Sequence, residues 1–258
     1  MKPLLHGYDI ADEVTAFSTT RKGGVSKGKY GEFNINSFCG DNATDIDVNR
    51  HLLAKALGVD PLKIIVPHQV HGTEICNVDE SLLALKQQDR EVAIDGYDAV
   101  MTNLGGVCIG VSTADCIPVL VYDSEHNAAA AIHAGWRGTV KRIVVRTIEE
   151  MQQTYNCNPG KLKAVIGPGI SLKNFEVGDE VYDEFCRAGF DMKTIAHRYE
   201  KWHLDLPECN RIQLVEAGLD DANIQMSGIC TYDSVAEYFS ARRLGIDSGR
   251  IYTALMMK

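Results

Sequence analysis

The middle of the chain contains five short apolar segments that follow one another closely. They are residues 73–78, 99–102, 107–112, 117–122 and 128–133. Each has the length of a strand and is flanked by Gly, Asn or Asp, and runs of this kind predict buried β-strands. A chain with this pattern is constrained to build a β-rich core with short connections.

Strands and helices alternate on both sides of this core. We predict further strands at residues 14–21, 63–66, 162–166, 224–226 and 251–256, and helices at residues 44–57, 139–155, 178–188 and 207–218. In the helix at 139–155, apolar residues recur at i, i+3, i+4 and i+7, so one face is expected to pack on a sheet. This order predicts a layered α/β or α+β fold with mixed sheets. No repeat or linker marks a boundary, so we expect one domain over residues 1–258.

The charge of the chain argues against two classes of partner. The formal net charge is −9 and the sequence pI is about 5.4, which does not suit a surface that binds nucleic acid or lies on an anionic membrane. The most apolar stretch, residues 107–122, is interrupted by Ser112, Thr113, Asp115 and Pro118, so it is too short to cross a bilayer. We therefore expect neither nucleic acid nor a membrane as a partner.

The N-terminal residues and the cysteines both indicate a reducing compartment. Asp9, Asp12 and Glu13 do not fit the basic and then apolar layout of a secretory signal. The eight cysteines are scattered and include no CxxC pair, which favours free thiols. We expect a cytoplasmic protein in which most cysteines are small buried residues.

Three segments at the ends of predicted strands carry residue types that bind metal ions. They are residues 67–72 (PHQVHG), 112–116 (STADC) and 132–138 (IHAGWRG). Zinc accepts imidazole and thiolate together, and three protein ligands leave a fourth position open for water or substrate. Taken singly, each His could be a hydrogen-bonded structural residue and Cys116 a core residue. Only folding could bring the three segments together.

The motifs along the chain resemble those of a known family. They comprise residues 20–26 (TRKGGVS), 33–36 (FNIN), 49–50 (NR), 68–72 (HQVHG), 98–99 (DA), 113–119 (TADCIPV), 133–138 (HAGWRG), 166–168 (IGP), 175–178 (FEVG) and 238–243 (YFSARR). The chain is similar to the YfiH-type, or laccase-domain, proteins, which are regarded as purine nucleoside phosphorylases with adenosine deaminase activity. The motifs keep the family's order and cover nearly the whole chain.

The resemblance implies a fold, a cofactor and substrates. It implies a single α/β domain of mixed sheets with helices outside, in an α/β/β/α arrangement. His71, Cys116 and His133 stand at the family's zinc-ligand positions, and the implied substrates are a purine nucleoside and phosphate. Two departures stand out: residues 167–174 contain none of the cysteines that many members carry in this loop, and Ala241 replaces a residue that is often aromatic or His.

Phosphorolysis needs an anion site and polar groups that hold the nucleoside. Arg21, in a Gly-rich turn, and Arg137, beside His133, are the candidates for phosphate, although either could be a surface or packing residue. Asn34 and Asn36 alternate with apolar residues, which would place both on one strand face lining the cleft, or they could stabilise a turn. Gln69 could hydrogen-bond to a base edge or orient water.

Deamination needs a group that transfers protons. Beside Cys116, we name Asp115 and Asp98 as catalytic candidates because they lie nearest in sequence to the ligands. Asp115 could instead cap a turn before Cys116. Trp136 could stack on a purine or pack in the core, and Arg242 and Arg243 could approach the cleft or remain solvated.

Three other functions remain open from the sequence. Cys116 could be a nucleophile activated by His133 in a hydrolase that acts on cell-wall precursors. Copper in place of zinc would fit an older description of the family as polyphenol oxidases, but eight dispersed His residues are few for a multicopper centre. A zinc site closed by Cys76 or His68 would be structural and not catalytic. The sequence does not indicate an oligomeric state.

Overall fold

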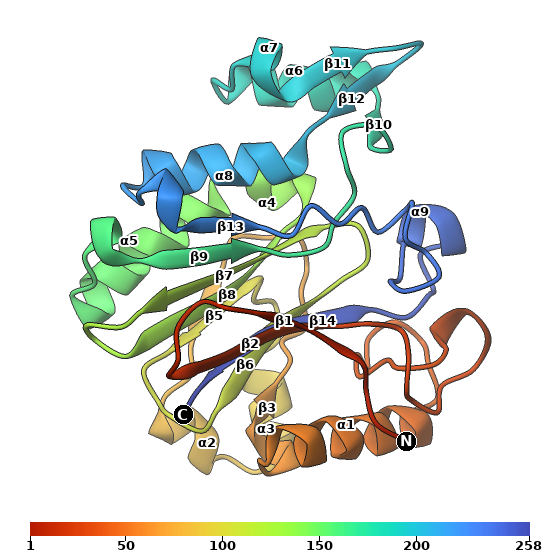
Figure 1. The fold of residues 1–258 in the computed structure, drawn as a ribbon, viewed down its shortest axis with the longest axis vertical. Coiled ribbons are helices and arrows are strands. Elements are labelled where there is room, and N and C mark those ends of the chain that lie inside the picture. The colour runs from red at the N-terminus through yellow and green to blue at the C-terminus, as the bar shows by residue number, and fades with distance from the viewer.

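The computed structural model describes residues 1–258. Its largest elements are two β-sheets that lie face to face (Figure 1). The first sheet has five strands in the order β1-β2-β14-β6-β3, and only β3 and β6 are parallel neighbours. Its strands are β1 (Leu5–Tyr8), β2 (Val14–Thr19), β14 (Ile251–Met257), β6 (Cys108–Thr113) and β3 (Ile64–Ile65).

The second sheet has six strands in the order β13-β9-β7-β8-β5-β4. Its edge pairs are parallel and its central pairs are antiparallel. Its strands are β13 (Ile224–Met226), β9 (Lys163–Ile166), β7 (Ile117–Asp123), β8 (Ala128–Ala134), β5 (Ala99–Thr102) and β4 (Ile75–Asn77). The predicted mixed sheets are therefore confirmed, and all five of the closely spaced segments form strands in one or the other.

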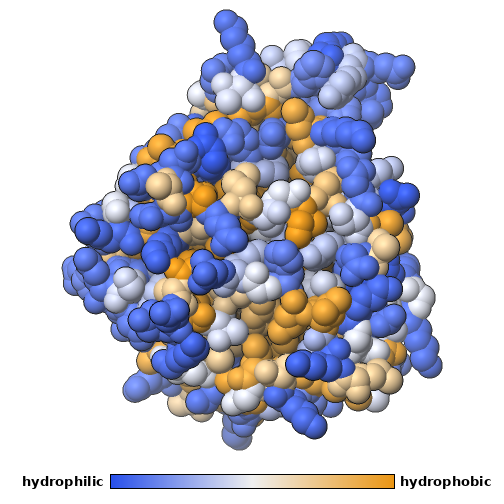
Figure 2. Space-filling model, in the orientation of Figure 1, coloured by the Kyte–Doolittle hydropathy of each residue, from blue (hydrophilic) through white to orange (hydrophobic).

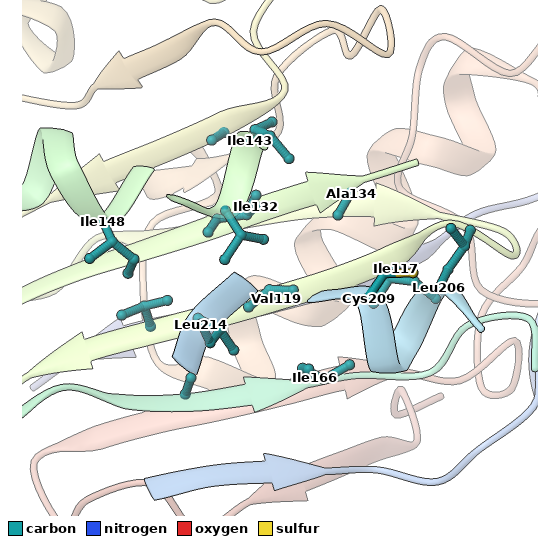
Figure 3. Packing of buried hydrophobic residues seen from close by; sticks show 14 of the residues in the cluster. Ile117, Val119, Ile132, Ala134, Ile143, Ile148, Ile166, Leu206, Cys209 and Leu214 are labelled. Atoms are coloured by element: carbon teal, nitrogen blue, oxygen red, sulfur yellow. The ribbon is translucent and has the colours of Figure 1, made fainter. Parts of the chain in front are cut away.

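Alternate residues of β7 face different hydrophobic cores, which explains why this strand is apolar throughout. Val119 and Val121 pack with helices α5 (Ile143–Tyr155) and α8 (Leu206–Glu216) on the outer face, as Figure 3 shows for neighbouring side chains of this cluster. Leu120 and Tyr122 pack between the two sheets. A strand buried on both faces has no polar side to alternate with.

The third core lies on the outer face of the five-stranded sheet. Helix α1 (Ala43–Leu57) packs Leu53 and Ala54 there, against Phe17 and Tyr252. Asn42 caps the start of α1 by accepting from two backbone N–H groups. The layers are therefore α/β/β/α, and this prediction is confirmed.

A small antiparallel sheet extends beyond α8, at the top of Figure 1. It contains β10 (Glu176–Val177), β12 (Trp202–Leu204) and β11 (Ala196–Arg198), and it was not predicted because its strands have only two or three residues. The remaining helices are α2 (Glu80–Ala84), α3 (Gln87–Ala93), α4 (Trp136–Val140), α6 (Asp179–Arg187), α7 (Met192–Ile195) and α9 (Ala241–Leu244), with four short 3-10 turns. None of the helices combines the length and apolar character that crossing a membrane requires. Figure 2 shows hydrophilic residues around the outline, with hydrophobic ones mainly toward the middle of the view.

Two local predictions are wrong. The helix predicted at 139–155 is broken into α4 and α5, because Arg142 adopts a left-handed conformation with φ 64°, which no Gly or Pro signals in the sequence. Residues 33–36 form no strand. Asn34 accepts from the N–H of Asn36, and Asn36 accepts from the N–H of Phe38, so these side chains stabilise turns. All eight cysteines are free, as expected.

Candidate metal centre and active-site cavity

Three chain segments that are distant in sequence meet at one end of the six-stranded sheet. Cys116 directly precedes β7, His133 lies near the end of β8, and His71 follows the segment that bridges to Asp95. The candidate ligand atoms of His71, Cys116 and His133 all lie within 4.8 Å of one another. The Sγ of Cys116 is 3.9 Å from the Nε2 of His71, and the two imidazole rings are 4.8 Å apart, edge to face. The juxtaposition expected from the motifs is present.

The backbone is strained where two of these residues are presented. His71 has φ 60°, and Asp115, the residue before Cys116, has φ 92°. Non-glycine residues are uncommon in this region and persist only where the surroundings hold them. One left-handed residue, His71, is itself a candidate ligand, and the other, Asp115, directly precedes one. The strands that lead to the site contain no such residue. This pattern is typical of a functional site.

Asp98 holds two of the three segments in place. Its carboxylate is fully buried and accepts from the backbone N–H groups of Val70, His71 and Gly72 at 3.2, 2.9 and 2.6 Å. It also accepts from Nδ1 of His133 at 2.7 Å. This bond fixes the orientation of the imidazole and leaves its other nitrogen for a ligand. Asp98 does not line the cavity, so its carboxylate contacts His133 and the backbone of residues 70–72 and does not face the cavity.

Cys116, His133 and Asp98 each stabilise the charged form of a neighbour. Burial raises the pKa of the Cys116 thiol, but the charge and hydrogen bonds of His133 and His71 outweigh burial and lower it to about 6. Burial lowers the pKa of His133, whereas Cys116 and Asp98 raise it to about 9. Burial raises the pKa of Asp98, yet the hydrogen bond and charge of His133 hold it below its usual value. The site therefore favours the thiolate, which is the form that binds metal.

Gly135 forms the wall beside all three candidate ligands. A Cβ atom at this position would lie 3.0 Å from Cδ2 of His71, 3.1 Å from Sγ of Cys116 and 3.7 Å from Cε1 of His133. Its φ of −67° suits any residue, so glycine is required here for space and not for backbone freedom. A side chain at 135 would push the ligands apart.

We therefore expect Gly135→Ala to weaken zinc binding with little effect on folding. Disturbing groups that support metal ligands costs about 10–100-fold in affinity, and we expect a loss in this range. Competition with a chromogenic chelator measures it. Gly7→Ala, where a Cβ meets nothing within 4 Å, is the control. Unchanged zinc affinity in Gly135→Ala would show that the three side chains do not share an ion.

The donor set fits zinc. Two imidazoles and a thiolate are ligands that zinc accepts, and three protein ligands leave one position open. His68 does not close the site, because its Nδ1 pairs with Asp95 at 2.5 Å and its ring stacks on Phe38. Cys76 lies in β4, away from the group of three. The structure therefore does not support His68 or Cys76 as a fourth protein ligand.

A cavity of about 510 Å³ opens beside the three residues. The rest of the lining combines apolar, polar and charged side chains. They are Asn36, Phe38, Cys39, His68, Gln69, Ser112, Thr113, Ala114, Asp115, Ile170, Phe175, Ala241, Arg242, Ile246 and Arg250. A cavity of this size holds a ligand as large as a nucleoside. Both cationic side chains come from the C-terminal part of the chain, which reaches the site through α9 and the loop before β14.

Three of the remaining predicted polar site residues line the cavity, and Asn34 does not. Asn36, Gln69 and Asp115 line the cavity. The side-chain amide of Gln69 forms two hydrogen bonds with the backbone of Ser112. Its oxygen accepts from the Ser112 N–H at 2.7 Å, and its NH₂ group donates to the Ser112 carbonyl at 2.8 Å. Asn34 is fully buried, does not line the cavity, and accepts from the N–H of Arg250.

The two arginines chosen from the sequence for phosphate lie outside the cavity. Arg21 donates to the carbonyls of Gly31 and Val235, so it ties loops together. Arg137 is exposed and stacks on Trp136 at 4.3 Å, and Trp136 packs against the main core. Neither guanidinium is therefore placed to meet an anion in the cavity.

Sequence reasoning missed Phe38, Phe175 and Arg250 as parts of the cavity. Arg250 carries no local signal, because it stands in a loop whose path depends on the whole fold. Arg242 and Arg243 were undecided from sequence. Arg242 lines the cavity, whereas Arg243 donates to the carbonyl of Tyr232 and lies outside it.

Comparison with known proteins gives consistent matches over nearly the whole chain. Residues 15–258 match the family described as multi-copper polyphenol oxidoreductase laccase. A purine nucleoside phosphorylase of Bacteroides thetaiotaomicron is 44% identical over 247 residues, covering 95% of this chain and 92% of that protein. Adenosine deaminase RL5 of an unknown prokaryotic organism is 41% identical over 252 residues, covering 95% and 94%. A crystal structure of YlmD from Geobacillus stearothermophilus has a TM-score of 0.92 at 30% identity, covering 100% and 97%.

Proposed function

The chain belongs to the multi-copper polyphenol oxidoreductase laccase family, and we propose that it is a zinc-dependent purine nucleoside phosphorylase that also deaminates adenosine. The observation that carries this proposal is the group of His71, Cys116 and His133 at the edge of a cavity of nucleoside size. The relative from Bacteroides thetaiotaomicron is named a purine nucleoside phosphorylase, and RL5 is named an adenosine deaminase. These names supply the two proposed reactions.

Zinc held by the three residues would act as a Lewis acid and would lower the pKa of a bound water. The chain itself supplies the orientation of the ligands, through Asp98, and the space between them, through Gly135. Copper is less well supported, because a trinuclear copper centre needs many His residues close together. The candidate metal group at the cavity contains only two of the eight His residues.

We assign phosphate to Arg242 and Arg250. The guanidinium of Arg250 donates to the carbonyls of Ser248, Gly249 and Ile246, and that of Arg242 donates to the carbonyl of Glu176. Carbonyl groups orient a guanidinium but do not neutralise its charge, and neither side chain forms an ion pair within 4.0 Å in the described chain. Two positive groups therefore remain available to an anion in the cavity.

We expect Arg242→Ala to raise the KM for phosphate about tenfold or more, because a charge-assisted hydrogen bond contributes about 1.5–3 kcal/mol. Arg243→Ala is a matched control, since the neighbouring arginine lies outside the cavity. Steady-state kinetics at varied phosphate and saturating nucleoside measure the effect. Equal KM values for the two variants would remove Arg242 from the phosphate site.

Asp115 has a positioning role in this account. One carboxylate oxygen accepts from Thr231 and the other from the N–H of Arg242, both at 2.7 Å. Asp115 thus fixes the start of α9, and with it the side chain of Arg242, beside Cys116. Each oxygen accepts one of these bonds and keeps a second acceptor position, so the two bonds hold the carboxylate in place beside the cavity.

The geometry also favours a second candidate, a cysteine hydrolase. Cys116, His133 and Asp98 form a nucleophile, a base and an orienting carboxylate in one row. The two functions differ in the need for metal. A metal-free enzyme that becomes acylated at Cys116 would support the hydrolase.

The deciding experiment supplies metal-analysed protein with adenosine, inosine, guanosine or methylthioadenosine, with and without phosphate, and identifies the products. The proposal expects free base and sugar 1-phosphate only when phosphate is present, and inosine from adenosine without it. Failure to release base from any nucleoside would overturn the phosphorylase. Unchanged adenosine would overturn the deaminase activity.

A further inference from the structure

A second group of metal-binding side chains lies at the opposite end of β7 from Cys116. Asp123 is the last residue of β7, His126 lies in the turn to β8, and Cys157 follows the end of α5. The ligand atoms of these three residues lie within 4.8 Å of one another. A seven-residue strand separates the two groups by roughly 20 Å. The second group therefore has no part in the cavity described above.

The local backbone brings these side chains together. The turn 124–127 contains Asn127 with φ 48°, and Oδ1 of Asp123 accepts from the N–H of Glu125 at 2.8 Å. Oδ2 of Asp123 contacts Nδ1 of His126 at 2.8 Å. On the other side, Asn156 has φ 59° and ends α5, so that Cys157 lies against the same carboxylate.

Two of the three side chains are buried and the third is partly exposed, so an ion bound between them would be reachable from solvent. Asp123 is fully buried and Cys157 is 4% exposed, whereas the His126 side chain is 36% exposed. No Lys or Arg pairs with Asp123, and His126 is its only ion-pair partner. The carboxylate accepts from the N–H groups of Glu125 and His126, contacts the His126 imidazole and accepts from the Cys157 thiol. The three side chains therefore already converge on one point, and His126 is the member that faces solvent.

We propose that Asp123, His126 and Cys157 form a second zinc site. A carboxylate, an imidazole and a thiolate are all zinc ligands, and water can complete the tetrahedron on the exposed side. The thiolate and carboxylate charges would balance the charge of Zn²⁺. The ion would tie the β7–β8 turn to the end of α5, so its role is structural.

The exchange of protons for metal is balanced. In the metal-free protein, burial and the neighbouring Asp123 raise the pKa of the Cys157 thiol, so this thiol carries its proton. Binding of Zn²⁺ therefore releases the thiol proton to solvent. No oxidant or other reactant is needed.

Zinc content after exhaustive dialysis tests the proposal, measured by mass spectrometry of the metal in the full chain. We expect two zinc ions per chain in the wild type, one in Cys116→Ala, one in Cys157→Ala and none in the double variant. Titration of the stripped Cys116→Ala protein with Co²⁺ alone gives an independent signal: thiolate-to-cobalt absorption that the double variant lacks must come from the second site.

His126→Ala guards against a folding artefact, since it removes a ligand from a surface turn without opening the core. It should lose one zinc ion, whereas His51→Ala, at another exposed histidine, should lose none. One zinc ion in the wild type and none in Cys116→Ala would overturn the second site while leaving the proposed enzyme intact. Loss of activity in Cys116→Ala together with one retained zinc ion would support both.

Discussion

Cys116→Ala is expected to lose the zinc ion at the cavity and nearly all activity. The substitution removes the one anionic ligand of the group, and the remaining His71 and His133 would hold an ion weakly. A Lewis acid stabilises the transition state by several kcal/mol, so we expect kcat/KM for phosphorolysis to fall about 10³-fold or more. Metal analysis and steady-state kinetics on the same preparation measure both effects.

Cys186→Ala is the control for this experiment, because Cys186 is an exposed free thiol on α6, away from the cavity. It should retain zinc and activity. Folding of Cys116→Ala is checked by its thermal transition, since the side chain is only half-buried and its loss leaves a small gap. A Cys116→Ala protein with normal turnover would contradict the proposed centre.

Asp98→Asn is expected to damage both the site and the fold. The amide keeps the size of the carboxylate but loses its charge, and its NH₂ group would face backbone N–H groups of residues 70–72 or Nδ1 of His133. Removing one partner of a buried pair costs about 3 kcal/mol or more of the free energy of unfolding. Loss of the orienting bond to a metal ligand costs about 10–100-fold in metal affinity.

Asp95→Asn carries the same chemical change at an exposed ion pair with His68. Exposed pairs contribute at most about 1 kcal/mol, so this variant should unfold near the wild-type denaturant midpoint and keep its zinc. Urea unfolding curves and chelator competition distinguish the two substitutions. Equal stability and equal zinc affinity for Asp98→Asn and Asp95→Asn would show that Asp98 is an ordinary buried carboxylate.

The sequence predicted a layered fold with mixed sheets because apolar strand segments alternate with amphipathic helices, and the family resemblance implied the α/β/β/α order of the layers. Strands were predicted at β7 and β8 on this basis, and helices were predicted at α1 and α8. The break at Arg142 was not predictable, because a left-handed arginine is imposed by tertiary packing and has no local signature. The short strands β10 and β12 are held by pairing with distant residues, which periodicity does not record.

The site was predictable where chemistry is tied to residue type and was not where it depends on position in space. His and Cys at strand ends indicated a metal, and the structure brings His71, Cys116 and His133 together. Arginine is common on surfaces, so nothing local separated Arg21 and Arg137 from Arg242 and Arg250. Asp98 was named for its position in sequence, but its contacts make it a support for His133 and the loop of His71.

The proposed activity requires one zinc ion shared by His71, Cys116 and His133, with an open position toward the cavity. A crystal of the purified protein, with anomalous diffraction measured on both sides of the zinc absorption edge, tests this directly. We expect a peak between the three side chains, at about 2.0–2.3 Å from each ligand atom, with no fourth protein ligand. A map with no peak there, or with the ion closed off by another side chain, would contradict it.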